Sequence, residues 1–306
     1  MKAVTKITFR DANGEKFFGD GPARLLRAIE ACGSLRAAAI SMDMAYTKAL
    51  KLMKQAETAL GFPLTTRTTG GKSGGGSVLT AEGKVWLDRY EAYVAACTEA
   101  NRMLLREFFP RVGCVIMASG LGKRFGSNKL MADFDGKPMF LRALQASDNL
   151  FDDRVVVTRH REVALLCEEL GVRTVLHGLP HRSDTVRLGL EALENIDGCM
   201  FLPADQPLLR RETVARIIQE WSRNQETILR PGCGGVPGSP VLFPAWTFPE
   251  LKALPEGKGG GYLIAQYPQS VREIAVEDPM ELADADTPQM LNLLQQRSEV
   301  LGELKL

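Results

Sequence analysis

The sequence has few of the residues on which metal and disulfide chemistry depend. Its 306 residues include three histidines, and its six cysteines are scattered singly without a CxxC pair. This scarcity argues against a zinc site and against a disulfide framework. Cys32, Cys97 and Cys199 stand among apolar neighbours, so we expect them to be small residues of a core.

Long apolar runs are also absent. No stretch approaches the roughly 18 to 20 residues of a membrane span, and the first residues lack the apolar centre of a secretory signal. We therefore expect a cytoplasmic protein without a membrane segment. A chain of 306 residues with ordinary globular composition is long enough for two domains.

Neither sign of charge is in large excess, since the net charge is +1. The two parts of the chain differ, however. Residues 1–109 hold 16 Lys and Arg against 11 Asp and Glu, whereas residues 110–306 hold 22 against 26. A basic N-terminal part is compatible with a module that faces nucleic acid.

The first domain, expected over residues 1–109, follows a pattern of short helices and strands. A strand over residues 6–10 leads into a turn at Asn13 and Gly14. Capping and periodicity then predict helices over 22–32, 35–42 and 45–60, followed by strands over 64–67 and 77–80 around a glycine-rich basic tip. This order is that of a winged helix-turn-helix.

A longer helix is predicted from Thr80 to about Phe108, where Pro110 follows and marks the boundary between domains. Its apolar residues recur every 3.5 positions and form a seam, namely Trp86, Tyr90, Tyr93, Cys97, Ala100 and Leu104. Such a seam predicts a dimerisation helix and hence a homodimer. The alternative is that it packs on the second domain of the same chain.

The pattern GSLRAAA, YTKALKLMKQAETALGFPL and LTAEG in residues 33–83 resembles the DNA-binding domain of molybdate-responsive regulators and, more distantly, of LysR-type regulators. The resemblance implies that the helix over 45–60 reads the DNA major groove. The expected contacts are Tyr46, Thr47, Lys48 and Lys51, with Lys72 at the tip of the wing. Winged helices also serve as modules for protein contact, which is the alternative.

The second domain, expected over residues 110–306, alternates apolar runs with amphipathic segments. Strands are predicted over 112–117, 154–158, 173–176 and 198–202, with helices over 138–149, 161–170, 184–195 and 211–223. This alternation predicts the α/β class, with a doubly wound, mostly parallel Rossmann-like sheet. Ligands of such sheets bind at the carboxyl ends of the strands.

The first of these strands runs directly into a glycine-rich loop. Residues 112–129 read VGCVIMASGLGKRFGSNK. Glycines at 120, 122 and 126 let backbone N–H groups approach phosphate oxygens, and nearby lysines and an arginine balance the charge. The spacing fits neither the dinucleotide fingerprint nor the Walker loop, so this is a polyphosphate loop of another kind.

The loop resembles the signature of nucleotidyltransferases, carried by Ala118, Ser119, Gly120, Arg124, Phe125, Gly126 and Lys129. With the stretches PADQP (203–207), GSPVLF (238–243) and DADTP (284–288), the chain is similar to the molybdenum cofactor cytidylyltransferase family. The resemblance implies transfer of a cytidylyl group from CTP to the phosphate of molybdopterin, in the maturation of a molybdenum hydroxylase apo-enzyme. The attacking phosphate is already anionic, so no general base is needed.

Nucleotidyl transfer requires positioning and positive charge more than covalent help. We expect Arg124 and Lys129 to bind the triphosphate and to act in catalysis together with Asp205. The remaining nucleotide contacts are expected from the loop itself, at Ala118, Ser119, Gly120, Leu121 and Gly122, with the backbone amides of the last three around the triphosphate.

Asp205 follows an apolar strand and lies between two prolines, which suits a carboxylate that holds Mg²⁺. The resemblance gives it this role and places a second ligand at Asp286, with Asp284 as the alternative. It also places Ser183 and Asp184 near the base and ribose, although the same residues could cap the following helix.

The acceptor is expected to face Gly238, Ser239, Pro240 and Lys258. Because the loop over 257–261 is rich in glycine, a plain flexible loop is the alternative at Lys258.

Ser119 is a departure from the family, whose cytidylyl branch has Ala-Ala-Gly at this point and whose guanylyl branch has additional glycine. Because serine leaves less room than glycine, we expect CTP rather than GTP. Two further alternatives are a nucleotidyltransferase with another phosphate acceptor, and a non-catalytic sensor that switches the DNA-binding domain. A sensor would not need both metal carboxylates.

Overall fold

The computed structural model describes residues 3–68, 76–122, 125–126 and 128–303. The chain separates into two compact units, Met1–Leu105 and Arg106–Leu306, close to the boundary predicted after residue 109. Two residues named above, Lys72 and Arg124, lie outside the described residues. Within the described part, no helix has the length and apolar character to cross a membrane.

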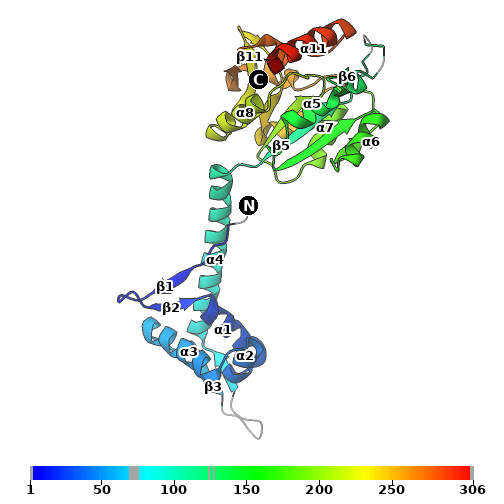
Figure 1. Cartoon of the computed structure of the whole chain (residues 1–306). Helices are drawn as coiled ribbons and strands as arrows, with labels where there is room; N and C mark the ends of the chain where they lie inside the picture. Colours follow the sequence, from blue (N-terminus) through cyan, green and yellow to red (C-terminus); the bar gives the residue numbers. More distant parts are fainter. Residues whose placement is uncertain (1–2, 69–75, 123–124, 127, 304–306) are drawn as a thin grey trace. The chain divides into compact units, whose positions relative to one another are not determined.

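The N-terminal unit is a winged helix-turn-helix, as predicted (Figure 1). Its elements are β1 (Thr8–Arg10), β2 (Lys16–Gly19), α1 (Asp20–Cys32), α2 (Leu35–Ser41), α3 (Tyr46–Leu60), β3 (Thr65–Thr68), β4 (Gly76–Leu79) and α4 (Ala81–Phe108). Both strand pairs are antiparallel. Gly33 ends α1 in the left-handed region with φ 69°, and the Ser34 hydroxyl caps α2 by accepting a hydrogen bond from the Ala37 N–H.

The predicted seam of α4 divides into two parts. Trp86 and Tyr90 pack against Phe9 and Phe18 in the core of the N-terminal unit, with ring centroids 5.0 to 5.8 Å apart. Tyr93 is half exposed, with its ring centroid 6.1 Å from that of Phe9, and further along Ala100 and Leu104 are exposed. The first part of the seam therefore stabilises its own unit, and only the second part remains for the predicted dimer.

The prediction for the cysteines is correct for Cys199, which is buried, and wrong for Cys32, which is exposed. Cys32 is the last residue of α1, where the chain turns at Gly33 and leaves the core. Cys97 is only partly buried because the N-terminal core ends near Val94, before the helix reaches it.

Gly83 fixes how the wing meets α4. A Cβ at this position would lie 2.2 Å from the Leu64 carbonyl oxygen. The same carbonyl accepts a hydrogen bond from the Thr80 N–H at 3.0 Å, and the Thr80 hydroxyl accepts one from the Gly83 N–H at 2.9 Å. The first turn of α4 is thus held directly against the backbone that enters β3.

We expect Gly83→Ala to destabilise the N-terminal unit by about 2 kcal/mol or more, because backbone must move to admit the methyl group. Thermal denaturation followed by circular dichroism would measure the change. The matched control is Gly21→Ala in α1, where a Cβ meets nothing within 4 Å. Equal melting temperatures for the two variants would contradict the expectation.

The second unit contains an eight-stranded sheet in the order β12-β11-β13-β10-β5-β8-β9, with β14 beside β11. Its strands are β5 (Val112–Ala118), β8 (Asp153–Thr158), β9 (Thr174–Leu176), β10 (Gly198–Pro203), β11 (Ile228–Cys233), β12 (Val236–Pro237), β13 (Val241–Pro244) and β14 (Val271–Ala275). The four strands predicted from the sequence form the parallel half, β10-β5-β8-β9. Strand β13 joins β10 antiparallel.

Helices cover both faces of this sheet, so the predicted doubly wound fold is confirmed (Figure 1). One face carries α5 (Phe140–Ala146), α6 (Arg161–Glu169), α8 (Arg211–Arg223) and α11 (Pro288–Glu303), and the other carries α7 (Arg182–Ala192), α9 (Phe248–Lys252) and α10 (Gly261–Gln266). Strand β5 contributes to both cores, since Cys114 and Ile116 face one side and Val115 the other. A small hairpin, β6 (Asp133–Phe134) and β7 (Lys137–Pro138), precedes α5 and includes Pro138, the first residue of the helix predicted over 138–149.

Candidate active site

A cavity of about 610 Å³ opens at the carboxyl ends of the parallel strands. Its lining includes the loop that follows β5 and the Asp205 segment that follows β10. Because β5 and β10 are adjacent and parallel, both segments emerge at the same edge of the sheet. The topology therefore brings together two motifs that are some eighty residues apart in the sequence.

The loop after β5 supplies one wall. Ser119, Gly120, Leu121 and Gly122 all line the cavity. Ala118, predicted with them, is instead buried behind the wall, where its carbonyl accepts a hydrogen bond from the Thr158 hydroxyl at 2.9 Å. Ala118 thus supports the loop from the sheet rather than facing the cavity.

Lys129 is the principal cation among the described residues at the acidic end of the cavity. It begins the short 3-10 turn Lys129–Met131, and only 7% of its surface is exposed. Its Nζ lies 2.6 Å from an Asp205 carboxylate oxygen and 2.8 Å from one of Asp286. Burial alone would lower the pKa of Lys129, but the two carboxylates outweigh it and raise the pKa above its ordinary value. Lys129 is therefore a charged ammonium group.

Three carboxylates gather around this ammonium group. Asp284 and Asp286 also line the cavity, and the Ala285 N–H donates to the Asp205 carbonyl at 2.9 Å, which ties their segment to the end of β10. Burial raises the pKa of Asp284, and the neighbouring Asp205 and Asp286 raise it further. Lys129 thus pairs directly with two of these three carboxylates, Asp205 and Asp286.

Gln206 adds a polar atom to this region. Its side-chain N–H group donates to an Asp284 oxygen and to the Leu282 carbonyl, each at 3.0 Å. Its Oε1 is buried and has no hydrogen-bond partner among the described residues. Carboxylate oxygens and an amide oxygen of this kind are the ligands that a hard cation such as Mg²⁺ prefers.

The described residues hold no group of three or more His, Cys, Asp or Glu side chains placed to bind a metal by themselves. Mg²⁺ usually takes one or two protein carboxylates and completes its shell with water and substrate phosphates.

The start of α7 forms the opposite end of the cavity, but not through the two residues predicted for it. Ser183 is buried, and Asp184 accepts a hydrogen bond from the His181 N–H at 3.0 Å in a capping box. The capping alternative describes Asp184, whereas the N-cap of α7 is His181 and Ser183 is a buried residue of its first turn. Their neighbours His181, Arg182 and Thr185 line the cavity instead.

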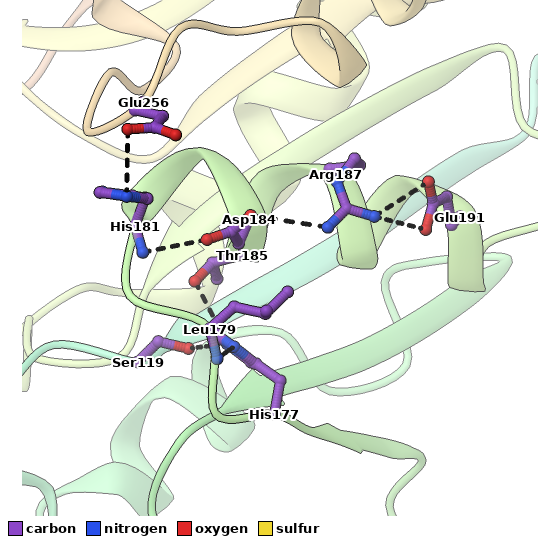
Figure 2. A network of polar contacts seen from close by, with 9 residues as sticks. All are labelled: Ser119, His177, Leu179, His181, Asp184, Thr185, Arg187, Glu191 and Glu256. Atoms are coloured by element: carbon purple, nitrogen blue, oxygen red, sulfur yellow. Dashed lines mark hydrogen bonds and ion pairs between the residues drawn. The ribbon is translucent and has the colours of Figure 1, made fainter.

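Two more residues at this end were not named from the sequence. Arg159 lines the cavity directly after β8, a position at a strand end that could have identified it. His177 lies 2.9 Å from the Ser119 hydroxyl through its Nε2, and Figure 2 shows the two side chains pointing toward each other with Thr185 alongside. A single histidine after a short strand gives no signal of this contact.

Among the predicted acceptor residues, Ser239 lines the cavity, whereas Gly238, Pro240 and Lys258 do not belong to the lining. Gly238 packs against Leu282, whose side chain would lie 2.7 Å from an added Cβ. The loop that contains Lys258 adjoins the cavity end of α7, since an added Cβ at Gly259 would lie 3.0 Å from the Arg182 side chain.

Comparison with known proteins agrees with this arrangement. Residues 114–271, more than half of the chain, match the family described as the MobA-like NTP transferase domain. The chain belongs to this family. Residues 23–84 match a second family, the bacterial regulatory helix-turn-helix proteins of the lysR family. The chain thus joins a nucleotidyltransferase domain to a regulator-type helix-turn-helix domain.

Individual curated relatives match little more than a third of the chain. A probable molybdenum cofactor guanylyltransferase of Bacillus licheniformis is 31% identical over 119 residues, which are 38% of this chain and 59% of that protein. A 3-deoxy-manno-octulosonate cytidylyltransferase of Francisella tularensis subsp. novicida is 28% identical over 112 residues, 35% of this chain and 44% of that protein. The chain therefore spans less than two thirds of the length of these curated relatives.

Among solved structures, Rv0371c from Mycobacterium tuberculosis aligns with 61% of this chain and 98% of its own, with a TM-score of 0.53 and 22% identity. At this identity the likeness concerns the fold alone. It agrees with the nucleotidyltransferase fold of the second unit.

Proposed function

We propose that the protein is a Mg²⁺-dependent CTP:molybdopterin cytidylyltransferase with a DNA-binding regulatory domain at its N-terminus. The observation that carries the proposal is the ion-pair cluster of Lys129 with Asp205 and Asp286, beside the glycine-rich loop in one cavity. It supplies both signs of charge that a metal-bound triphosphate needs.

We assign a separate role to the glycine-rich loop, to Lys129 and to the two carboxylates. Gly120, Leu121 and Gly122 line the cavity, and we assign their backbone N–H groups to the phosphate oxygens. Lys129 moves from its carboxylate partners to the α-phosphate, where its charge stabilises the transition state. Asp205 and Asp286 are the residues that would hold Mg²⁺. The ion would supply positive charge between the reacting phosphates.

The attacking group requires no base from the protein. A phosphate acceptor is ionised at neutral pH, so proton removal is not part of the transfer. Positioning is then the main contribution of the chain, and Ser239 on the cavity wall is the described residue that we assign to the acceptor side. Arg124 remains an expectation for the triphosphate, outside the described residues.

The proposal also names the nucleotide base, cytosine or guanine. Relatives named as guanylyltransferases support GTP, whereas the cytidylyltransferase of Francisella and the serine at position 119 support CTP. We choose CTP because the Ser119 side chain occupies space that a larger purine would need.

The test offers labelled CTP or GTP to the full-length protein with Mg²⁺ and molybdopterin, and measures pyrophosphate together with the labelled product. Release of pyrophosphate with CTP supports the proposal. Preferential use of GTP would show that the base is guanine and not cytosine. No release with either nucleotide would exclude the enzyme and favour a regulator that only senses its ligand. Replacing molybdopterin by a sugar phosphate tests the other acceptor class.

The N-terminal unit presents a basic helix that suits DNA. Tyr46, Thr47, Lys48 and Lys51 are all exposed at the start of α3, the helix that enters the major groove in helix-turn-helix domains. Lysines in this position contact phosphates, which supply most of the sequence-independent affinity.

We expect Lys48→Ala and Lys51→Ala each to weaken DNA binding at all sequences and to reduce the slope of log affinity against log salt by about 1. Fluorescence anisotropy with duplex DNA at several salt concentrations would measure both. Lys84→Ala is the matched control, because Lys84 is exposed on α4 of the same unit and pairs with Glu30 at 3.6 Å. An unchanged salt slope in all three variants would argue for a protein-contact module.

A further inference from the structure

Ser119 stands where this chain departs from the usual loop, and His177 is its side-chain partner (Figure 2). His177 follows β9, and Ser119 follows β5, two strands away in the sheet. Ser119 lines the cavity, whereas His177 is set behind it and does not belong to the lining. Through this contact, His177 can determine whether the Ser119 hydroxyl donates or accepts a hydrogen bond with a ligand, although His177 does not touch the ligand itself.

The hydrogen bonds of His177 determine which ring nitrogen carries the proton. The Leu179 N–H donates to Nδ1 at 3.2 Å, so Nδ1 must be the unprotonated nitrogen. In the neutral ring Nε2 therefore bears the hydrogen, and it donates to the Ser119 hydroxyl oxygen at 2.9 Å. The Thr185 hydroxyl lies further from the same nitrogen, at 3.5 Å.

The surroundings keep this ring neutral. Burial lowers the pKa of His177, and the positive charges of Arg159 and Arg187 lower it further against the opposing effect of Asp184. A protonated ring would also direct an Nδ1–H at the Leu179 N–H. Both effects favour one tautomer with one donor, aimed at Ser119.

Most of the hydrogen-bonding capacity of the Ser119 hydroxyl is then taken up within the protein. It has one hydrogen and two lone pairs. The hydrogen is donated to the Val157 carbonyl at 3.1 Å, and one lone pair accepts the hydrogen of His177. The remaining lone pair can only accept a hydrogen bond. A base with an exocyclic amine can donate a hydrogen bond to this lone pair. A base with a carbonyl in the same place would instead bring its oxygen against the Ser119 oxygen, and the two would repel each other.

We infer that His177 is a positioning residue that presents Ser119 as a hydrogen-bond acceptor, and that this pair selects a nucleotide with an exocyclic amine, cytosine rather than uracil. The inference rests on the proposed function and deepens it, because it names a pair of residues that reads the base. His177 acts through Ser119, so removing the histidine frees the hydroxyl to rotate and donate to a uracil carbonyl.

The test is a comparison of CTP and UTP binding by the full-length protein, measured by calorimetry with Mg²⁺ for the wild type, Ser119→Ala, His177→Ala and the double variant. We expect the wild type to prefer CTP by about tenfold or more, the effect of one hydrogen bond whose loss leaves a polar group unpaired. Each single variant should bring the ratio close to one. The double variant should change it no further, because the two residues act as one unit.

His177→Gln is the conservative variant, since its side-chain N–H can replace the Nε2–H, and it should retain most of the preference. The inference would be overturned if His177→Ala left the ratio of CTP to UTP affinity unchanged. It would also be overturned if His177→Ala changed that ratio as much in the Ser119→Ala protein as in the wild type. Failure to bind any nucleoside triphosphate would instead contradict the proposed function, on which the inference depends. Binding with a wild-type ratio near one would overturn the inference alone.

Discussion

Asp205→Asn should lower the rate of pyrophosphate release by about two to three orders of magnitude at saturating CTP and Mg²⁺. The substitution keeps the size and shape of the side chain but removes its charge and replaces one acceptor oxygen by an NH2 donor. It therefore removes one of two proposed carboxylate ligands of the metal and a 2.6 Å ion-pair partner of Lys129 at once. The measurement is the steady-state rate as a function of Mg²⁺ concentration, which should shift to higher metal in the variant.

Asp153→Asn is the matched control for this experiment. Asp153 is exposed to nearly the same extent as Asp205, 20% against 22% of the side chain, and it pairs with Arg173 at 2.9 Å. It begins β8 at the end of the strand opposite to the cavity. If both variants retained the wild-type rate, Asp205 would have no part in the transfer and the metal site would have to lie elsewhere.

The layout of the transferase domain could be predicted because local patterns determine it. Buried strands such as Val112–Ala118 are continuous apolar runs, and helices such as Arg211–Arg223 have a clear apolar face, so both kinds of element were found within a few residues. The rule that ligands bind at carboxyl strand ends then located the Gly120 loop and Asp205 at one edge. Periodicity alone did not reveal the antiparallel strands β11 and β13, which complete the sheet.

Other features depend on tertiary packing and could not be read from local sequence. Lys129 and Asp286 were each named, but their 2.8 Å contact joins residues 157 positions apart. The polar stretch around Ser183 and Asp184 lies at one end of the cavity, yet helical geometry buries Ser183, uses Asp184 to cap α7 and leaves Thr185 in the cavity lining. The periodic seam of α4 likewise did not show where the N-terminal core ends.

Lys129→Met should abolish tight binding of the nucleotide and should also destabilise the transferase unit when no nucleotide is bound. The lysine is nearly buried and balances Asp205 and Asp286, so its removal leaves a cluster of carboxylates that includes the partly buried Asp284. Breaking a buried pair by removing one partner leaves an uncompensated charge. Since Asp286 is half exposed, we expect a loss of about 2 kcal/mol at pH 7, below the range for fully buried pairs.

The dependence of this loss on pH follows from the direction of the pKa shifts. Burial and the neighbouring carboxylates already raise the pKa of Asp284 above its ordinary value, and because Lys129 opposes this rise, removing the lysine raises that pKa further. The folded state then binds more protons than the unfolded state, so the variant regains stability as the pH falls. Urea denaturation of the transferase unit at pH 7 and pH 5 should show a larger gap from the wild type at pH 7. Lys252→Met, at an exposed lysine of α9, is the control and should unfold like the wild type at both values. An equal loss of stability at pH 7 and pH 5 in Lys129→Met would indicate that this lysine stabilises the free protein by packing of its aliphatic stem and not by balancing charge.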